Sequence, residues 1–131
     1  MQLLLLAALG GAIGASLRFL VNQAFSGPQI SGGVLVFPWA TLIVNVVGGF
    51  LMGVVFVLVH ERLGGSPLWR TFLATGCLGG LTTFSAYSLD MMNLLIDEGL
   101  SARFFVYTIG SVVLAFAALA LGLAATRAVL T

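Results

Sequence analysis

Long apolar stretches separated by short polar turns run through the whole chain. No ionisable side chain occurs between Phe19 and Val59, and the run from Thr71 to Leu89 is also uncharged. One membrane-spanning helix needs about 20 apolar residues, so the pattern predicts four such helices. We place them at about residues 3–24, 38–60, 68–95 and 101–127, joined by turns that contain glycine or charged residues. The predicted fold class is therefore an all-α membrane protein, with residues 1–131 forming a single four-helix transmembrane domain.

The third predicted helix contains a segment that is unfavourable for a helix. Two glycines, Gly79 and Gly80, are followed after Leu81 by two β-branched residues, Thr82 and Thr83. Glycine and threonine both weaken a helix interior, and backbone groups freed in a membrane must be satisfied by protein or in a wet cavity. We therefore expect the helix to be interrupted at Gly79–Thr83, near the midplane, beside an ion or substrate site. The carbonyl end of such a break suits a cation and the N–H end an anion.

The composition agrees with a membrane protein. Hydrophobic residues make up 60% of the chain and charged residues 7%, whereas about a quarter of a soluble domain is charged. The net charge of +1 gives no reason to expect nucleic acid as a partner. Met1 and Gln2 place no basic segment before the first apolar run, so we interpret that run as a spanning helix and not as a signal peptide.

The positions of the arginines give only a weak signal for orientation. With four crossings, both termini and the turn between the second and third helices lie on one side, with Arg62, Arg70 and Arg127. The other side has Arg103, and Arg18 lies toward it in the first helix. This asymmetry either suffices to orient the chain or permits insertion in both directions and pairing with an inverted copy.

Glycines repeat at a four-residue spacing on three of the predicted helices. The pairs are Gly10 and Gly14, Gly49 and Gly53, and Gly76 and Gly80. Such faces let helices approach closely. We expect them to pack helices together and to serve in pairing with an inverted copy.

Few polar side chains lie at membrane depth. An amide in lipid needs hydrogen-bond partners, so Asn45 is a candidate functional residue, with Thr41 one turn before it. Serine hydroxyls in membranes often bond only their own helix, and this interpretation stays open for Ser85 and Ser111. Tyr107 and Ser111 are four residues apart and therefore share one helix face.

Two charged side chains in the predicted spans have roles that the sequence leaves open. Arg18 either extends its charge to the membrane surface or stands in a polar vestibule that attracts anions. Asp90 is the only carboxylate within a predicted span. Because Asp90 is near a helix end, we expect water or an arginine as its partner.

The chain offers no set of residues typical of an enzyme. His60 is the only histidine, and no spacing supports a metal site built from side chains. The inventory instead combines uncharged donors with aromatic rings, whose edges are positive. Together these groups can replace the water around a small, hard anion without holding it at a fixed charge.

These motifs resemble one family, the Fluc (CrcB) fluoride channels, over nearly the whole chain. Residues 10–18 form a glycine-rich face that ends in Arg18, and residues 45–53 match the pattern Asn-x-x-Gly-x-Phe-x-x-Gly. The most specific match is Gly-Cys-Leu-Gly-Gly-Leu-Thr-Thr-Phe-Ser at residues 76–85. The resemblance implies a fluoride-selective ion channel, not an enzyme, that exports fluoride passively across the inner (plasma) membrane as a multi-pass protein.

The resemblance also implies an antiparallel, dual-topology homodimer with two fluoride pores in the lipid bilayer. A structural sodium ion (Na+) is expected at the dimer centre, held by the backbone carbonyls of Gly79 and Thr82. The residues that the match implies for the anion pathway are Asn45, Phe84, Tyr87, Ser85, Tyr107, Ser111, Thr41 and Arg18.

Two positions depart from the family pattern, and two other functions remain as alternatives. Ala86 stands where the family usually has threonine, and Tyr87 stands where it usually has a second phenylalanine. Tyr87 keeps a ring edge and adds a hydroxyl donor. A small proton-coupled multidrug exporter would need Asp90 as its membrane carboxylate. A structural subunit of a larger membrane complex would be inactive when purified alone.

Overall fold

The computed structural model describes residues 1–25, 30–31, 34–35 and 37–130. Its helices are α1 (Gln2–Phe25), α2 (Trp39–Val57), α3 (Pro67–Trp69), α4 (Gly79–Leu81), α5 (Phe84–Glu98) and α6 (Ala102–Leu130), with π-helical segments η1 (Leu58–Arg62) and η2 (Arg70–Leu78). Two short strands, β1 (Ile30–Ser31) and β2 (Val34–Leu35), pair antiparallel with Ile30 opposite Leu35. Most of the loop predicted between the first two helices lies outside the described residues.

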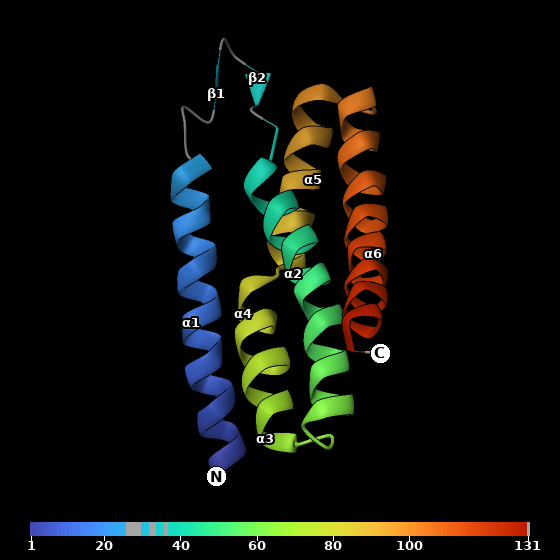
Figure 1. Cartoon of the computed structure of the whole chain (residues 1–131). Helices are drawn as coiled ribbons and strands as arrows, with labels where there is room; N and C mark the ends of the chain where they lie inside the picture. The colour runs from blue at the N-terminus through green and yellow to red at the C-terminus, as the bar shows by residue number, and fades with distance from the viewer. Residues whose placement is uncertain (26–29, 32–33, 36, 131) are drawn as a thin grey trace.

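The four predicted spans correspond to three continuous helices and one interrupted helix, which run side by side (Figure 1). Three of them are continuous helices that are long and apolar enough to cross a membrane: Gln2–Phe25, Trp39–Arg62 and Ala102–Leu130. The predicted third span consists of two half-helices, α3–η2–α4 and α5. The N-terminus, the turn before α3 and the C-terminal end of α6 lie at the same end of the molecule, as the sequence predicts (Figure 1).

The interruption in the third span is real but shorter than predicted. Gly79, Gly80 and Leu81 are helical, and only Thr82 (ψ 155°) and Thr83 (ψ 124°) are extended. The prediction that the break includes the two glycines is wrong. A Cβ at Gly80 would lie 2.7 Å from the carbonyl oxygen of Gly11, so this glycine is needed for close packing against α1.

Two segments of the chain have wider π-helical turns that the sequence does not predict. These are η1 at the end of α2 and η2 between α3 and α4. A π-turn adds one residue to a turn and leaves the apolar character of the segment unchanged. A hydropathy pattern therefore does not distinguish it from an α-helix.

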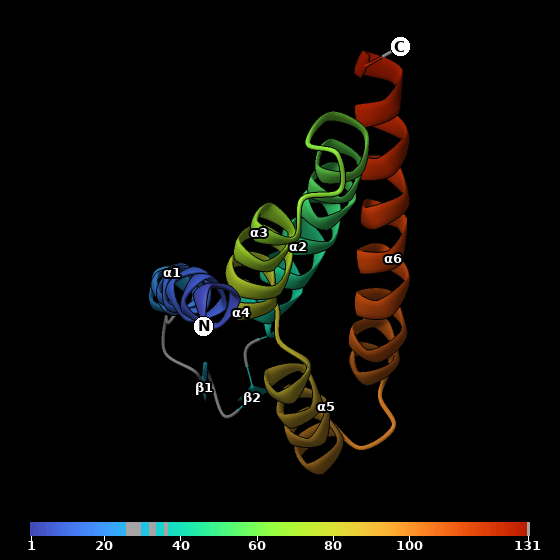
Figure 2. The same ribbon diagram turned by 90° about the horizontal axis from the view of Figure 1, so that it is seen from below.

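The predicted glycine faces are filled by packing within the chain. A Cβ at Gly10 or Gly14 would overlap the backbone of η2, and one at Gly49 or Gly53 would overlap the backbone of α6. Viewed from below, η2 and α4 lie against α1, and α2 lies between them and α6 (Figure 2). These glycines thus pack helices together inside one chain, and their use in pairing with a second copy stays a prediction.

The break redirects the second half of the third span. In Figure 2, α5 points away from the axis of α4 and lies toward the start of α6. Its inner side contributes Tyr87 and Leu94 to a small buried cluster with Tyr107 of α6. At the α5–α6 turn, Arg103 forms a salt bridge with Glu98. The half-helix after the break is therefore held mainly against α6.

Candidate functional site

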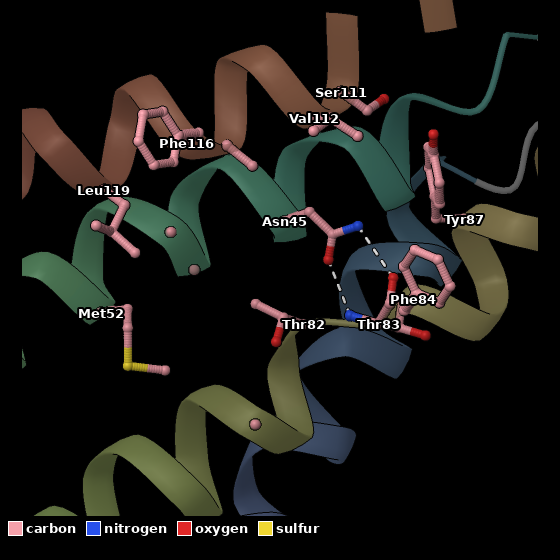
Figure 3. A pocket seen from close by; sticks show the side chains of 14 residues that line it. Asn45, Met52, Thr82, Thr83, Phe84, Tyr87, Ser111, Val112, Phe116 and Leu119 are labelled. Carbon is pink, nitrogen blue, oxygen red and sulfur yellow. Dashed lines mark hydrogen bonds between the residues drawn. The ribbon is translucent and has the colours of Figure 1, made fainter. Parts of the chain in front are cut away.

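Asn45 bonds both backbone groups of a residue in the break. Its Oδ1 accepts a hydrogen bond from the Thr83 amide at 2.8 Å, and its Nδ2 donates to the Thr83 carbonyl at 3.1 Å (Figure 3). In an uninterrupted helix the Thr83 amide would donate to the Gly79 carbonyl. The α2 side chain thus replaces helix bonds that the break removes, which explains why an amide is placed at this depth.

The two threonines of the break satisfy further groups. The Thr82 hydroxyl donates to the Leu78 carbonyl at 2.9 Å. The Thr83 hydroxyl accepts from the Ala86 amide at 3.2 Å and so caps the start of α5. The Ser85 hydroxyl lies 3.2 Å from that of Thr83. Ser85 is therefore part of the cap region at the break.

A pocket of about 640 Å³ opens beside the break between α2, α4, α5 and α6 (Figure 3). Its walls combine apolar side chains with a few uncharged polar groups, and they include no Asp, Glu, Lys, Arg or His. The lining residues are Asn45, Gly48, Gly49, Met52, Gly79, Thr82, Thr83, Phe84, Tyr87, Ser111, Val112, Ala115, Phe116 and Leu119. The structure thus brings Asn45, Phe84, Tyr87 and Ser111 together, as the sequence predicts.

Ser111, one of the residues that line the pocket, has a buried hydroxyl group without a hydrogen bond to any described residue. Ser111 is only 3% exposed, and its hydroxyl has no hydrogen-bond partner among the residues that the structure describes. The hydroxyl of Thr108, one turn earlier on α6, is also buried and also has no hydrogen-bond partner among the described residues. A buried unpaired hydroxyl costs about 1–3 kcal/mol, so Ser111 is a candidate donor to a ligand in the pocket.

Thr41 and Tyr107 lie outside the pocket lining and meet at Asp90. The Thr41 hydroxyl donates to Asp90 Oδ2 at 2.6 Å, and the Tyr107 hydroxyl donates to the same oxygen at 3.0 Å. Thr41 is 7% exposed and Tyr107 is 0% exposed. The expectation of water or an arginine beside Asp90 missed these two partners, because they come from α2 and α6 and are far away in sequence.

Tyr87 connects the pocket with this second cluster. Its ring centroid lies 5.6 Å from that of Phe84 and 5.6 Å from that of Tyr107. Its hydroxyl donates to the Thr108 carbonyl at 2.8 Å. The hydroxyl donor that the sequence predicts at Tyr87 is therefore already bonded to a backbone carbonyl of α6.

Arg18 is directed at the helix break. Its guanidinium donates to the Thr82 carbonyl at 3.4 Å, so a side chain of α1 contacts the break from the side opposite Asn45. Arg18 does not line the pocket. Its positive charge stands at the carbonyl end of the first half-helix, where a cation is favoured.

Sequence reasoning missed some residues that the site uses. Thr83 is the partner of Asn45, and Thr108 receives the bond from Tyr87. For Asp90 a signal was present, because it is the only carboxylate in a predicted span. The sequence indicates Thr83 only as part of the break and gives no such signal for Thr108, since membrane threonines commonly bond their own helix.

Taken together, the fold and the site define a class of protein. The chain is a multi-pass helical membrane protein whose third span is broken beside a pocket with a few uncharged polar groups, the arrangement found at ion and substrate sites in membranes. Residues 5–123 match the family model for the CrcB-like proteins, described as Camphor Resistance (CrcB). The chain belongs to this family.

Similar proteins share nearly the full length of the chain and carry one name, fluoride-specific ion channel FluC. The protein of Rhizobium leguminosarum bv. trifolii is 46% identical over 127 residues, which cover 95% of each chain. That of Rhizobium meliloti is 44% identical over 131 residues, covering 98% of each chain. That of Hahella chejuensis is 42% identical over 123 residues, covering 94% of this chain and 93% of the relative. Their name describes an ion channel and not an enzyme.

The two Asn45 bonds predict that Asn45→Leu destabilises the protein. The substitution leaves the amide and the carbonyl of Thr83 unpaired at membrane depth, which should lower the free energy of unfolding by about 2–5 kcal/mol. SDS-induced unfolding in mixed micelles, followed by circular dichroism, measures this change.

Asn93 provides a matched control for this substitution. Asn93 is also half-buried, and its side chain forms no hydrogen bond within the described part of the chain. Asn93→Leu should change the free energy of unfolding by less than about 1 kcal/mol. Equal effects of the two substitutions would show that the break does not depend on Asn45.

Proposed function

We propose that the protein is a fluoride-selective ion channel that lets fluoride leave the cell passively across the inner (plasma) membrane. The observation that carries the proposal is the pocket at the helix break. No charged side chain lines it, and Ser111, one of its lining residues, has a buried hydroxyl without a hydrogen-bond partner among the described residues. The relatives, which are named fluoride-specific ion channels and share nearly the whole chain, support the same function.

The pocket's chemistry favours a small anion that accepts strong hydrogen bonds. Fluoride has the most concentrated charge of the halides, so hydroxyl and amide donors can replace its water at short range. Chloride is larger and accepts weaker hydrogen bonds, so it recovers less of its hydration energy from the same donors. Each tenfold of selectivity needs about 1.4 kcal/mol of difference between the two ions. Ring edges can add to the stabilisation because they are positive.

The predicted pathway residues then take different roles. Ser111 supplies the donor in the pocket, and Phe84, which is 77% exposed in the single chain, presents a ring at its mouth. Tyr107 and Thr41 supply hydroxyls at the Asp90 cluster. Asn45 acts mainly by holding the break that shapes the pocket.

We propose that the working unit is an antiparallel dual-topology homodimer with two pores. The weak arginine asymmetry permits insertion in both directions, and both ends of the chain lie on one side of the fold. The pocket is open and Phe84 is largely exposed in the single chain. A second, inverted copy would cover this face and complete the wall of each pore.

A sodium ion fits the chemistry of the break. The Thr83 amide donates to Asn45, so the Gly79 carbonyl loses its usual helix partner. Among the described residues, the Thr82 carbonyl accepts only a long 3.4 Å bond, from Arg18. These oxygens are neutral, which suits a monovalent cation better than a divalent one. Two carbonyls from each chain would hold the ion at the dimer centre, where its charge would stabilise the facing breaks.

Conduction is tested with the purified protein in liposomes. We expect fluoride to leave down its gradient without a proton gradient, and chloride to leave far more slowly, as ion-selective electrodes measure. Phe84→Ile keeps an apolar side chain but removes the ring edge, and it should slow fluoride efflux at least about tenfold. Equal fluoride and chloride rates, or a requirement for a proton gradient, would contradict the channel.

Orientation is tested by labelling cysteines in cells. With Cys77→Ala as background, Ser66→Cys places one thiol in the turn before α3, and a membrane-impermeant reagent should label it from both sides of the membrane. Adding positive charge to the same turn with Leu63→Lys and to α3 with Leu68→Lys should shift the labelling to one side. One-sided labelling of the chain without these lysines would rule out dual topology.

The sodium site is tested by prolonged exchange into sodium-free medium. We expect the dimer to dissociate at a lower detergent concentration after exchange, and the original stability to return when sodium is added back. Potassium at the same ionic strength serves as the control. Unchanged dimer stability and fluoride efflux in the absence of sodium would argue against a structural ion.

A further inference from the structure

The two tyrosines of the chain join α5 and α6 by hydrogen bonds that run in opposite directions. Tyr87 of α5 donates to the Thr108 carbonyl of α6 at 2.8 Å, and Tyr107 of α6 donates to Asp90 of α5 at 3.0 Å. Tyr87 is 8% exposed and Tyr107 is 0% exposed. The first bond therefore fixes the position of α5 against one particular turn of α6.

In the described part of the chain, the two hydroxyl groups of that turn, on Thr108 and Ser111, lack the hydrogen bond to their own helix that other hydroxyls of the chain form. The hydroxyls of Thr82, Ser88 and Thr126 each donate to the carbonyl four residues earlier, at 2.9, 2.9 and 2.7 Å. Those of Thr108 and Ser111 are buried but form no such bond within the described residues. Local helix geometry therefore does not hold the Ser111 hydroxyl, and its position depends on what surrounds the turn.

We infer that Tyr87 is a positioning residue for Ser111, a role that rests on the proposed function because it treats the Ser111 hydroxyl as a donor to the passing anion. Thr108 and Ser111 are three residues apart and lie on one face of α6. Tyr87 and Ser111 both line the pocket. The hydrogen bond from Tyr87 to the Thr108 carbonyl thus sets the distance between the aromatic ring of Tyr87 and the hydroxyl group of Ser111.

The role requires the hydroxyl and not only the ring. Tyr87→Phe keeps the ring packed against Phe84 and Tyr107. The Thr108 carbonyl keeps its own helix partner in α6, so no buried acceptor is left wholly unpaired. The variant should therefore fold, while the turn that bears Ser111 becomes free to move relative to α5.

The test is a double-mutant cycle on fluoride efflux from liposomes. We expect Tyr87→Phe to slow efflux about fivefold and Ser111→Ala about tenfold, and the double variant to be within about twofold of Ser111→Ala alone. Thr126→Val removes another hydroxyl that bonds an α6 carbonyl but does not line the pocket. It should leave efflux within about twofold of the unmodified protein.

Two outcomes overturn the inference. One is unchanged efflux in Tyr87→Phe, and the other is a double variant slowed by about the product of the single effects, since independent residues act additively in free energy. If the unmodified protein carries no fluoride, the proposed function fails. Amide hydrogen exchange then tests separately whether the Tyr87–Thr108 hydrogen bond holds this turn of α6. Amide exchange at residues 108–112 should be faster in Tyr87→Phe than in the unmodified protein or Thr126→Val. Equal exchange rates would show that the Tyr87–Thr108 hydrogen bond does not hold this turn.

Discussion

The paired hydrogen bonds between Asn45 and Thr83 are the interaction on which the rest of the structure depends. A helix broken in a membrane exposes an N–H and a C=O that lipid cannot satisfy. One primary amide carries both an acceptor and a donor, so a single side chain of α2 satisfies both groups. Thr83 is then free to cap α5 through its hydroxyl. The chain can therefore change direction at membrane depth with the amide and the carbonyl of Thr83 both bonded.

Close glycine packing supplies the second constraint. Because Gly14 and Gly80 let α1 and the first half-helix touch through their backbones, the break is held from one side while Asn45 holds it from the other. Gly49 and Gly53 bring α2 equally close to α6. The pocket lies on the side of the break that faces away from α1, between α2, α4, α5 and α6.

The spans, the existence of the break and the importance of Asn45 could be predicted because each depends on local chemistry: apolar length, helix propensity, or an amide that needs partners. The length of the break could not, since Gly79 and Gly80 weaken a helix in general but here permit packing that holds one. The partners of Asp90 could not either. Thr41 and Tyr107 are 49 and 17 residues away from it, and only the fold shows that three helices meet there.

The absence of a charged side chain among the pocket's lining residues has a physical reason if an anion must leave as readily as it enters. A fixed cation about 4 Å away would hold a monovalent anion with on the order of 4 kcal/mol at an intermediate dielectric constant. That energy corresponds to roughly a thousandfold slower release. Arg18 is the nearest candidate for such a trap, yet its guanidinium is directed at the Thr82 carbonyl and does not line the pocket. Neutral donors such as Ser111 each offer only about 1 kcal/mol of net stabilisation, so binding sufficient to replace water remains weak enough for conduction.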